Sequence, residues 1–152
     1  MLAAAASGPK YPVLVWNRSP SVPVGLYLVL ARPAHVGDYV ATRLSGTMQA
    51  LAERRSYIGP NTPVLKRVAA SEGDRVCRRG RIVQIAEERF VIALVSDRQG
   101  RQLPVWQGCY QLQNDQRFVL GTHLESFDSR YFGPINREQI VGVAIPIFTI
   151  QL

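Results

Sequence analysis

Cysteine and histidine are both scarce in this chain of 152 residues, which contains two of each. Neither Cys77 nor Cys109 belongs to a C-x-x-C pair, and His35 and His123 lie far from both cysteines in the sequence. The spacing of a structural zinc site is therefore absent, and we expect no metal and no other cofactor. The cysteines fit a disulfide in an oxidising compartment and equally well buried thiols in a reducing one.

Long apolar runs are absent too. The longest, residues 140–148, is interrupted by Pro146 and is too short for a membrane-spanning helix. The first ten residues, MLAAAASGPK, lack the basic start and the long apolar core of a signal peptide. We expect residues 1–11 to be an amino-terminal stub whose membrane anchor is absent or removed, and residues 12–152 to form a single catalytic domain.

Negative charge is in the minority, because 18 Lys and Arg residues face 11 Asp and Glu residues and leave a net charge of +7. Such an excess is typical of proteins that bind nucleic acid or an anionic membrane surface. The basic residues are scattered, however, and the densest clusters, 53–55 and 77–81, are short and contain no aromatic residues. We interpret both clusters mainly as solvated surface, and we expect a membrane rather than nucleic acid as the anionic partner.

The chain does contain many short segments rich in β-branched and aromatic residues, each bounded by Gly, Pro, Asp or Asn. These segments are 11–16, 25–31, 38–43, 63–70, 74–78, 81–85, 89–95, 117–122 and 140–150. One helix is predicted from Thr47 to Tyr57, with an apolar stripe of Met48, Leu51 and Ala52. This pattern predicts a mainly β domain of barrel type with one short helix.

The stretch SPSVPVGLY, residues 19–27, carries two serines in a turn stiffened by Pro20 and Pro23. A serine hydroxyl is a weak nucleophile unless a neighbouring base takes its proton. Because Ser19 and Ser21 are two residues apart, both hydroxyls can project in the same direction. Taken alone, the stretch is a weak signal, because most serines in such a setting simply form a turn that leads into a strand.

The stretch PVLKRVAASEGDRV, residues 63–76, places a lysine among apolar neighbours. On a strand, Val64, Lys66 and Val68 share one face. Burial would lower the pKa of the amine, so that Lys66 could act as a general base. In the alternative, this face is solvated and the lysine has no chemical role.

The stretch SFDSRYFGPI, residues 126–135, contains Asp128 and Arg130, which are spaced to form an ion pair. Ser126 and Ser129 add hydroxyls that could orient a neutral amine. His123 lies close in sequence, so that a Ser-His-Asp triad with Asp128 and either serine is an alternative. Triads are defined by geometry rather than by proximity in sequence, and we favour the serine–lysine arrangement.

In this order, the three stretches resemble the nucleophile, lysine and carboxy-terminal boxes of the serine–lysine signal peptidases, which have a β-fold like that of LexA. They are most similar to the conjugative-transfer branch, the TraF-type peptidases that mature pilin precursors. Residues 97–109, DRQGRQLPVWQGC, also resemble a segment typical of this branch, and the resemblance extends over residues 12–150. One departure is the turn at residues 72–74, which reads EGD where the family usually has PGD.

The resemblance implies a serine endopeptidase in which Ser21 is the nucleophile and Lys66 is the general base. It further implies that the Ser19 hydroxyl and the Ser21 N–H stabilise the oxyanion. The substrate would be a pilin precursor or another exported precursor, which is hydrolysed or cyclised. Two other enzymes are alternatives: a general type I signal peptidase and a self-cleaving LexA-like protein. The alternative that is not an enzyme is a basic β-barrel binding module.

The resemblance also assigns supporting roles. Ser126 matches the serine that orients the lysine, while Asp128 and Arg130 match the pair that holds this region together. Catalytic domains of this family lie on the periplasmic side of the bacterial inner membrane, where disulfides persist. This location favours a disulfide between Cys77 and Cys109, and contact with the membrane surface.

Overall fold

The computed structural model describes residues 13–151, so the stub predicted at residues 1–11 lies outside the described residues. Most of the described elements are strands, and the predicted mainly β fold is confirmed. The strands are β1 (Val13–Asn17), β2 (Val24–Leu30), β3 (Tyr39–Thr42), β4 (Val64–Ala70), β5 (Arg75–Arg79), β6 (Ile82–Ile85), β7 (Arg89–Ile92), β8 (Gly108–Gln111), β9 (Gln116–Leu120), β10 (Ile135–Asn136) and β11 (Ile140–Ile150). The helices are α1 (Gly46–Arg54), the one-turn α2 (Ser129–Phe132) and the 3-10 helix η1 (Arg137–Gln139).

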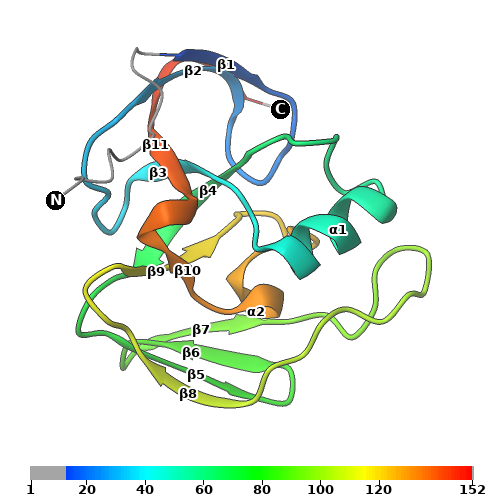
Figure 1. The fold of residues 1–152 in the computed structure, drawn as a ribbon. Coiled ribbons are helices and arrows are strands. Elements are labelled where there is room, and N and C mark those ends of the chain that lie inside the picture. Colours follow the sequence, from blue (N-terminus) through cyan, green and yellow to red (C-terminus); the bar gives the residue numbers. More distant parts are fainter. Residues whose placement is uncertain (1–12, 152) are drawn as a thin grey trace, which may run out of the picture.

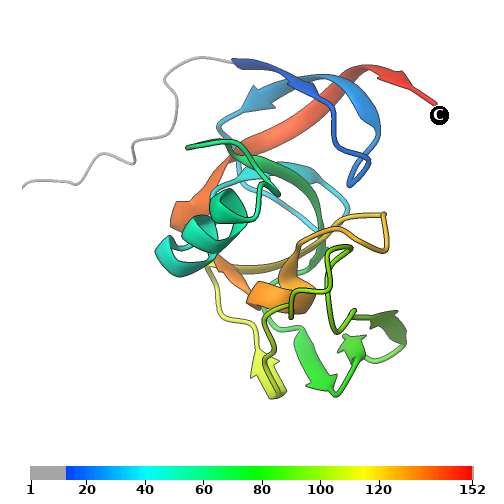
Figure 2. The same ribbon diagram turned by 90° about the vertical axis from the view of Figure 1, so that its right-hand side faces the viewer.

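The strands form two sheets. A seven-stranded sheet has the order β1-β2-β11-β3-β4-β9-β10, and a four-stranded sheet has the order β7-β6-β5-β8. Both sheets are open, since the edge strands of each make no pairing with one another among the described residues. Figures 1 and 2 show the small sheet at one end of the molecule, β1 and β2 at the other, and α2 between them.

All nine predicted strand segments overlap an observed strand, whereas β8 and β10 are not predicted from the sequence. Helix α1 ends at Arg54, three residues before the predicted end at Tyr57. The helix stops early because Ser56 has a φ of 57°, in the left-handed region, and the chain turns there. Of the predicted apolar stripe only Ala52 is buried.

Strand β4 positions the lysine. On one side it pairs with β3, where Val40 lies opposite Lys66. On the other side it pairs with β9 only from Arg67 onward, where Arg67 lies opposite Leu120. The edge of β4 from Val64 to Lys66 is therefore not covered by β9, and other loops can approach it there.

The small sheet packs against the rest of the domain through a core that includes Val76, Val83, Ile85 and Phe118. Strands β5 and β8 are also joined covalently, because the structure has a disulfide between the facing residues Cys77 and Cys109. Their Cα atoms lie 4.1 Å apart. This bond fastens the outer strand of the small sheet to its neighbour.

Candidate active site

The loop between β1 and β2 carries both serines of the opening stretch, and Asn17 holds its two ends together. The Asn17 side chain accepts the Ser19 N–H at 3.1 Å and donates to the carbonyl oxygens of Ser19 at 2.8 Å and of Val22 and Pro23 at 3.2 Å each. Ser21 lies inside this loop and is only 7% exposed. Asn17 was not singled out from the sequence, although an asparagine at the start of a Ser-Pro turn is a common turn signal.

Lys66 is 4% exposed, so the solvated alternative for this residue is wrong. Its Nζ lies 3.0 Å from Ser21 Oγ, although the two residues are 45 positions apart in the sequence. Burial lowers the pKa of Lys66 from 10.5 to about 8, opposed by the negative charge of Asp128 and assisted by the positive charge of Arg130. About one-tenth of the amine is therefore neutral at pH 7 and about half at pH 8, far more than for an exposed lysine.

The Ser21 hydroxyl has three polar neighbours: Lys66 Nζ, Ser19 Oγ at 3.0 Å and Ser126 Oγ at 2.9 Å. A hydroxyl donates one hydrogen bond and accepts two. If Lys66 is neutral, Ser21 can donate to the amine lone pair and accept from both serines, which satisfies it completely. The Ser126 hydroxyl thus contacts Ser21, and its expected role in orienting the lysine stays a prediction.

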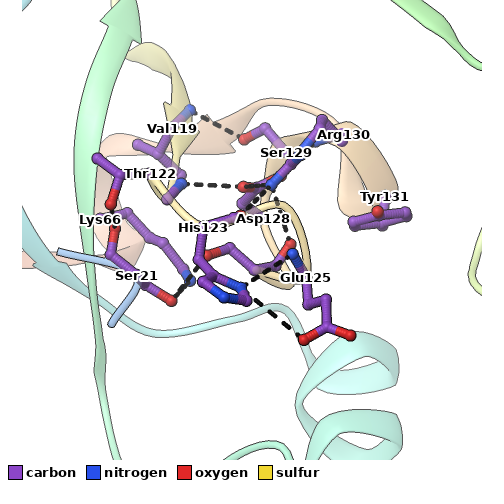
Figure 3. Close-up of polar contacts among 12 residues, drawn as sticks. Ser21, Lys66, Val119, Thr122, His123, Glu125, Asp128, Ser129, Arg130 and Tyr131 are labelled. Atoms are coloured by element: carbon purple, nitrogen blue, oxygen red, sulfur yellow. Dashed lines mark hydrogen bonds and ion pairs between the residues drawn. The ribbon is translucent and has the colours of Figure 1, made fainter. Parts of the chain in front are cut away.

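Asp128 and Arg130 form a buried two-pronged ion pair, with Nε–Oδ1 and Nη2–Oδ2 distances of 2.9 and 2.7 Å. Asp128 also accepts the Gly121 N–H at 2.9 Å, while Arg130 donates to the carbonyls of His123 and Ser126 at 3.1 and 3.3 Å. Figure 3 shows this pair in the same view as Ser21 and Lys66. Because each buried charge is paired and hydrogen-bonded, the pair can fix the loop that carries Ser126.

Two residues of this loop that sequence reasoning missed contact the nucleophile loop. Thr122 donates its N–H to the Ser21 carbonyl at 2.7 Å, and its hydroxyl lies 3.2 Å from the carbonyls of Pro20 and Ser21. A Cβ on Gly121 would overlap Ser126 Oγ and lie 3.0 Å from Ser21 Cβ. A glycine inside the predicted strand 117–122 was the available signal, since it often marks a close approach of two segments.

The alternative Ser-His-Asp triad is not formed in the described structure. His123 Nδ1 accepts the Glu125 N–H at 3.2 Å and lies 3.9 Å from its carboxylate. The Asp128 carboxylate is used by Arg130 and the Gly121 N–H. Ser129 instead accepts the Val119 N–H at 3.0 Å, which fastens α2 to β9.

A cleft of about 780 Å³ opens beside Ser21 and Lys66. Its lining comes from residues 15–21, 55–59 and 62–66 and from parts of 94–103 and 123–131. A cavity of this size accommodates a short segment of extended peptide. The uncovered edge of β4 and the segment 97–109 noted in the sequence both contribute to its walls.

Comparison with known proteins identifies the family. The model of the family described as signal peptidase, peptidase S26, matches residues 1–149. The chain belongs to this signal peptidase family. It is 34% identical over 145 residues to the plasmid transfer protein TraF of Escherichia coli, covering 88% of this chain and 81% of that protein. It is also 34% identical over 146 residues to the conjugal transfer protein TraF of Agrobacterium fabrum, with the same coverage.

A crystal structure of a signal peptidase I from Enterococcus faecalis covers 75% of this chain and 98% of its own, with 19% identity and a TM-score of 0.41. The resemblance to signal peptidases and to the TraF-type branch is confirmed by the family match and the relatives. The peptidase therefore has a signal peptidase-type function, which is a serine protease activity. Within residues 13–151, no helix has the length and apolar character needed to cross a membrane.

Proposed function

We propose that this peptidase processes a pilin precursor of a conjugation system, with Ser21 as nucleophile and Lys66 as general base. The observation that carries the proposal is the 3.0 Å contact between Lys66 Nζ and Ser21 Oγ, made by two side chains that are both almost fully buried. The pKa of about 8 for Lys66 supports the base role, since a neutral amine can take a proton.

In the proposed reaction, Lys66 takes the hydroxyl proton of Ser21 while Oγ attacks the carbonyl carbon of the scissile peptide bond. The oxyanion accepts hydrogen bonds from the Ser21 N–H and from the Ser19 hydroxyl. In the structure the Ser21 N–H donates to Ser19 Oγ at 3.3 Å, so the two groups are adjacent, and in the proposed reaction this N–H would turn from Ser19 to the oxyanion. The ammonium of Lys66 then protonates the leaving amine as the tetrahedral intermediate collapses to the acyl-enzyme.

Water resolves the acyl-enzyme when a linear product is made. An amine of the substrate itself would instead attack the ester carbon, so that a new peptide bond forms while the ester bond to Ser21 Oγ breaks. The proton that the amine loses would pass through Lys66 to Ser21 Oγ. Both outcomes are compatible with one dyad, because they differ only in the second nucleophile. The pilin assignment is supported by the two relatives, whose names are those of plasmid and conjugal transfer proteins.

Contact with a membrane surface, on the periplasmic side of the inner membrane, is part of the same proposal. Strands β1, β2 and β11 present a face of cross-strand apolar partners, in which Trp16 lies opposite Leu26 and Leu26 opposite Phe148. Leu14, Trp16 and Phe148 are 60%, 49% and 59% exposed. An exposed apolar face of this kind fits insertion into the headgroup region of a bilayer.

The test is to incubate the peptidase with a pilin precursor in lipid vesicles and to measure the product masses. We expect Ser21→Ala and Lys66→Ala to abolish processing and Ser129→Ala, whose hydroxyl bonds Val119, to retain more activity. A product lighter than the linear one by the mass of one water would indicate cyclisation. Normal processing by both dyad variants would refute the assignment. If Ser19→Ala loses processing while Ser21→Ala remains fully active, Ser19 is the nucleophile and Ser21 is not.

A further inference from the structure

The walls of the cleft carry more positive than negative side chains. Its charged lining, apart from Lys66 and His123, consists of the guanidinium groups of Arg18, Arg55, Arg98 and Arg101 and the carboxylates of Asp97 and Glu125. Both carboxylates are occupied by arginines of the same wall. A substrate in the cleft therefore meets an excess of positive charge.

Both carboxylate oxygens of Asp97 accept two hydrogen bonds each. One carboxylate oxygen accepts the Tyr57 hydroxyl at 2.6 Å and Arg101 Nε at 2.7 Å, and the other accepts the N–H groups of Gln99 and Arg101. These hydrogen bonds, led by that from Tyr57, hold the pKa of Asp97 well below its usual range. Asp97 is therefore fully ionised and has no free oxygen with which to pair another arginine.

Glu125 is occupied in the same way by Arg98, which contacts both carboxylate oxygens and has an Nε–Oε1 distance of 2.7 Å. This pair joins the 97–101 turn to the loop that carries Ser126. Arg55 is held through one nitrogen, which donates to the Gln102 carbonyl at 2.8 Å and to the Tyr57 hydroxyl at 3.3 Å.

Arg18 differs from these residues because it is exposed and makes no hydrogen bond or ion pair with any side chain or backbone group of residues 13–151. It is three positions before Ser21, on the same loop, so their Cα atoms are at most about 11 Å apart. An extended peptide advances by about 3.3 Å per residue. The long Arg18 side chain can thus reach substrate side chains within about three residues of the scissile bond.

We propose that Arg18 is a specificity-determining residue that pairs with a carboxylate side chain of the substrate close to the scissile bond. The peptidase then prefers precursors that carry Asp or Glu at that position over neutral or basic ones. This inference rests on the proposed role of Ser21 and Lys66, since it needs the substrate to lie in their cleft. Charge pairing at the rim of a binding site mainly affects selectivity and association, and it weakens as salt is added.

The experiment uses a set of peptides derived from a processed precursor. Each of the three positions on either side of the cleaved bond is occupied in turn by Glu, Gln or Lys, and kcat/KM is measured in low salt and in about 1 M salt. The variants are Arg18→Gln and Arg18→Glu. Arg32→Glu is the matched control, because Arg32 is an exposed arginine that does not line the cleft.

At one position at least, we expect the Glu peptide to be cleaved roughly three- to tenfold faster than the Gln peptide, and the Lys peptide more slowly than either. Arg18→Gln should remove this order, Arg18→Glu should reverse it, and Arg32→Glu should leave it unchanged. High salt should reduce the difference in the wild type.

Equal cleavage of the three peptides by the wild type, or an unchanged order in Arg18→Glu, would overturn the proposal while leaving the dyad intact. The same holds if Arg18→Glu weakens binding to vesicles of anionic lipid without changing peptide selectivity, because Arg18 would then be a membrane contact. Cleavage that persists in Ser21→Ala would instead refute the proposed function, and the role of Arg18 with it.

Discussion

Replacing Lys66 with methionine should abolish activity and yet stabilise the fold at neutral pH. The unfolded chain keeps the lysine proton up to about pH 10.5, whereas the folded chain releases it near pH 8. At about 1.4 kcal/mol per pH unit, this difference corresponds to a destabilisation of about 3 kcal/mol below pH 8. The lost hydrogen bond to Ser21 offsets about 1 kcal/mol, so Lys66→Met should be more stable than wild type by about 2 kcal/mol at pH 6.5.

The gain should disappear as the pH rises. Between pH 8 and 10.5 the unfolded wild type binds a proton at Lys66 that the folded protein has released, so its free energy of unfolding increases with pH. Urea unfolding of wild type and Lys66→Met at pH 6.5 and 9.5 measures this directly, because the other titrating groups cancel in the difference. Ser21→Ala keeps the buried amine and should keep the wild-type pH dependence.

The lowered pKa of Lys66 is contradicted if Lys66→Met is no more stable than wild type at pH 6.5, or if the difference in stability between them is the same at both pH values. Either result would mean that burial does not lower the pKa of Lys66 to about 8. The base role would then lose its physical basis, even if the variant were inactive. A variant that is more stable but inactive would instead show the usual trade-off, in which a functional group is kept although it lowers the stability of the fold.

Further predictions concern the rate and the fold. The kcat/KM of the wild type should rise with pH and level off above about pH 8, as Lys66 loses its proton; a flat profile from pH 6 to 9 would contradict the base role. Ser19→Ala should lower kcat roughly 100-fold with little change in KM, measured on a peptide substrate, since one oxyanion donor is lost. Gly121→Ala should lower both the melting temperature and kcat, because the added Cβ overlaps Ser126 Oγ; unchanged thermal unfolding would show that the loop yields freely. Replacing Cys77 and Cys109 together with alanine should cost about 3 to 4 kcal/mol in urea unfolding, given the separation of 32 residues, and an equally stable double variant would contradict this.

Much of the strand pattern and the two residues of the dyad could be predicted from the sequence. Strand signals are local, and β4 shows why they suffice: Leu65 and Val68 are buried on opposite faces, and the strand occurs where the β-branched run predicts it. Lys66 is unusual as the charged residue that shares the face of Val68. Its pairing with Ser21 was reached through the resemblance, because nothing local joins residues 45 positions apart.

The elements that were missed are those whose identity depends on tertiary contacts. Helix α2 is a single turn, too short to show a helical period, and it begins where the Asp128 side chain accepts the Arg130 N–H. Strand β8 has four exposed residues and no alternation, so only its pairing with β5 defines it. In the sequence, Gly121 is one glycine within the predicted strand 117–122, and only the structure places Ser126 against it.

The supports of the nucleophile loop explain why such residues can matter as much as the dyad. The Asn17 side chain donates to the carbonyls of Val22 and Pro23, and the Thr122 N–H donates to the Ser21 carbonyl, so the acceptors on the loop are all main-chain atoms. Because main-chain atoms are common to all residues, the sequence of the loop cannot show these bonds. Yet they fix the direction of the Ser21 N–H and hydroxyl, on which attack and oxyanion binding both depend. The precision of the site therefore resides in Asn17 and Thr122 as well as in Ser21 and Lys66.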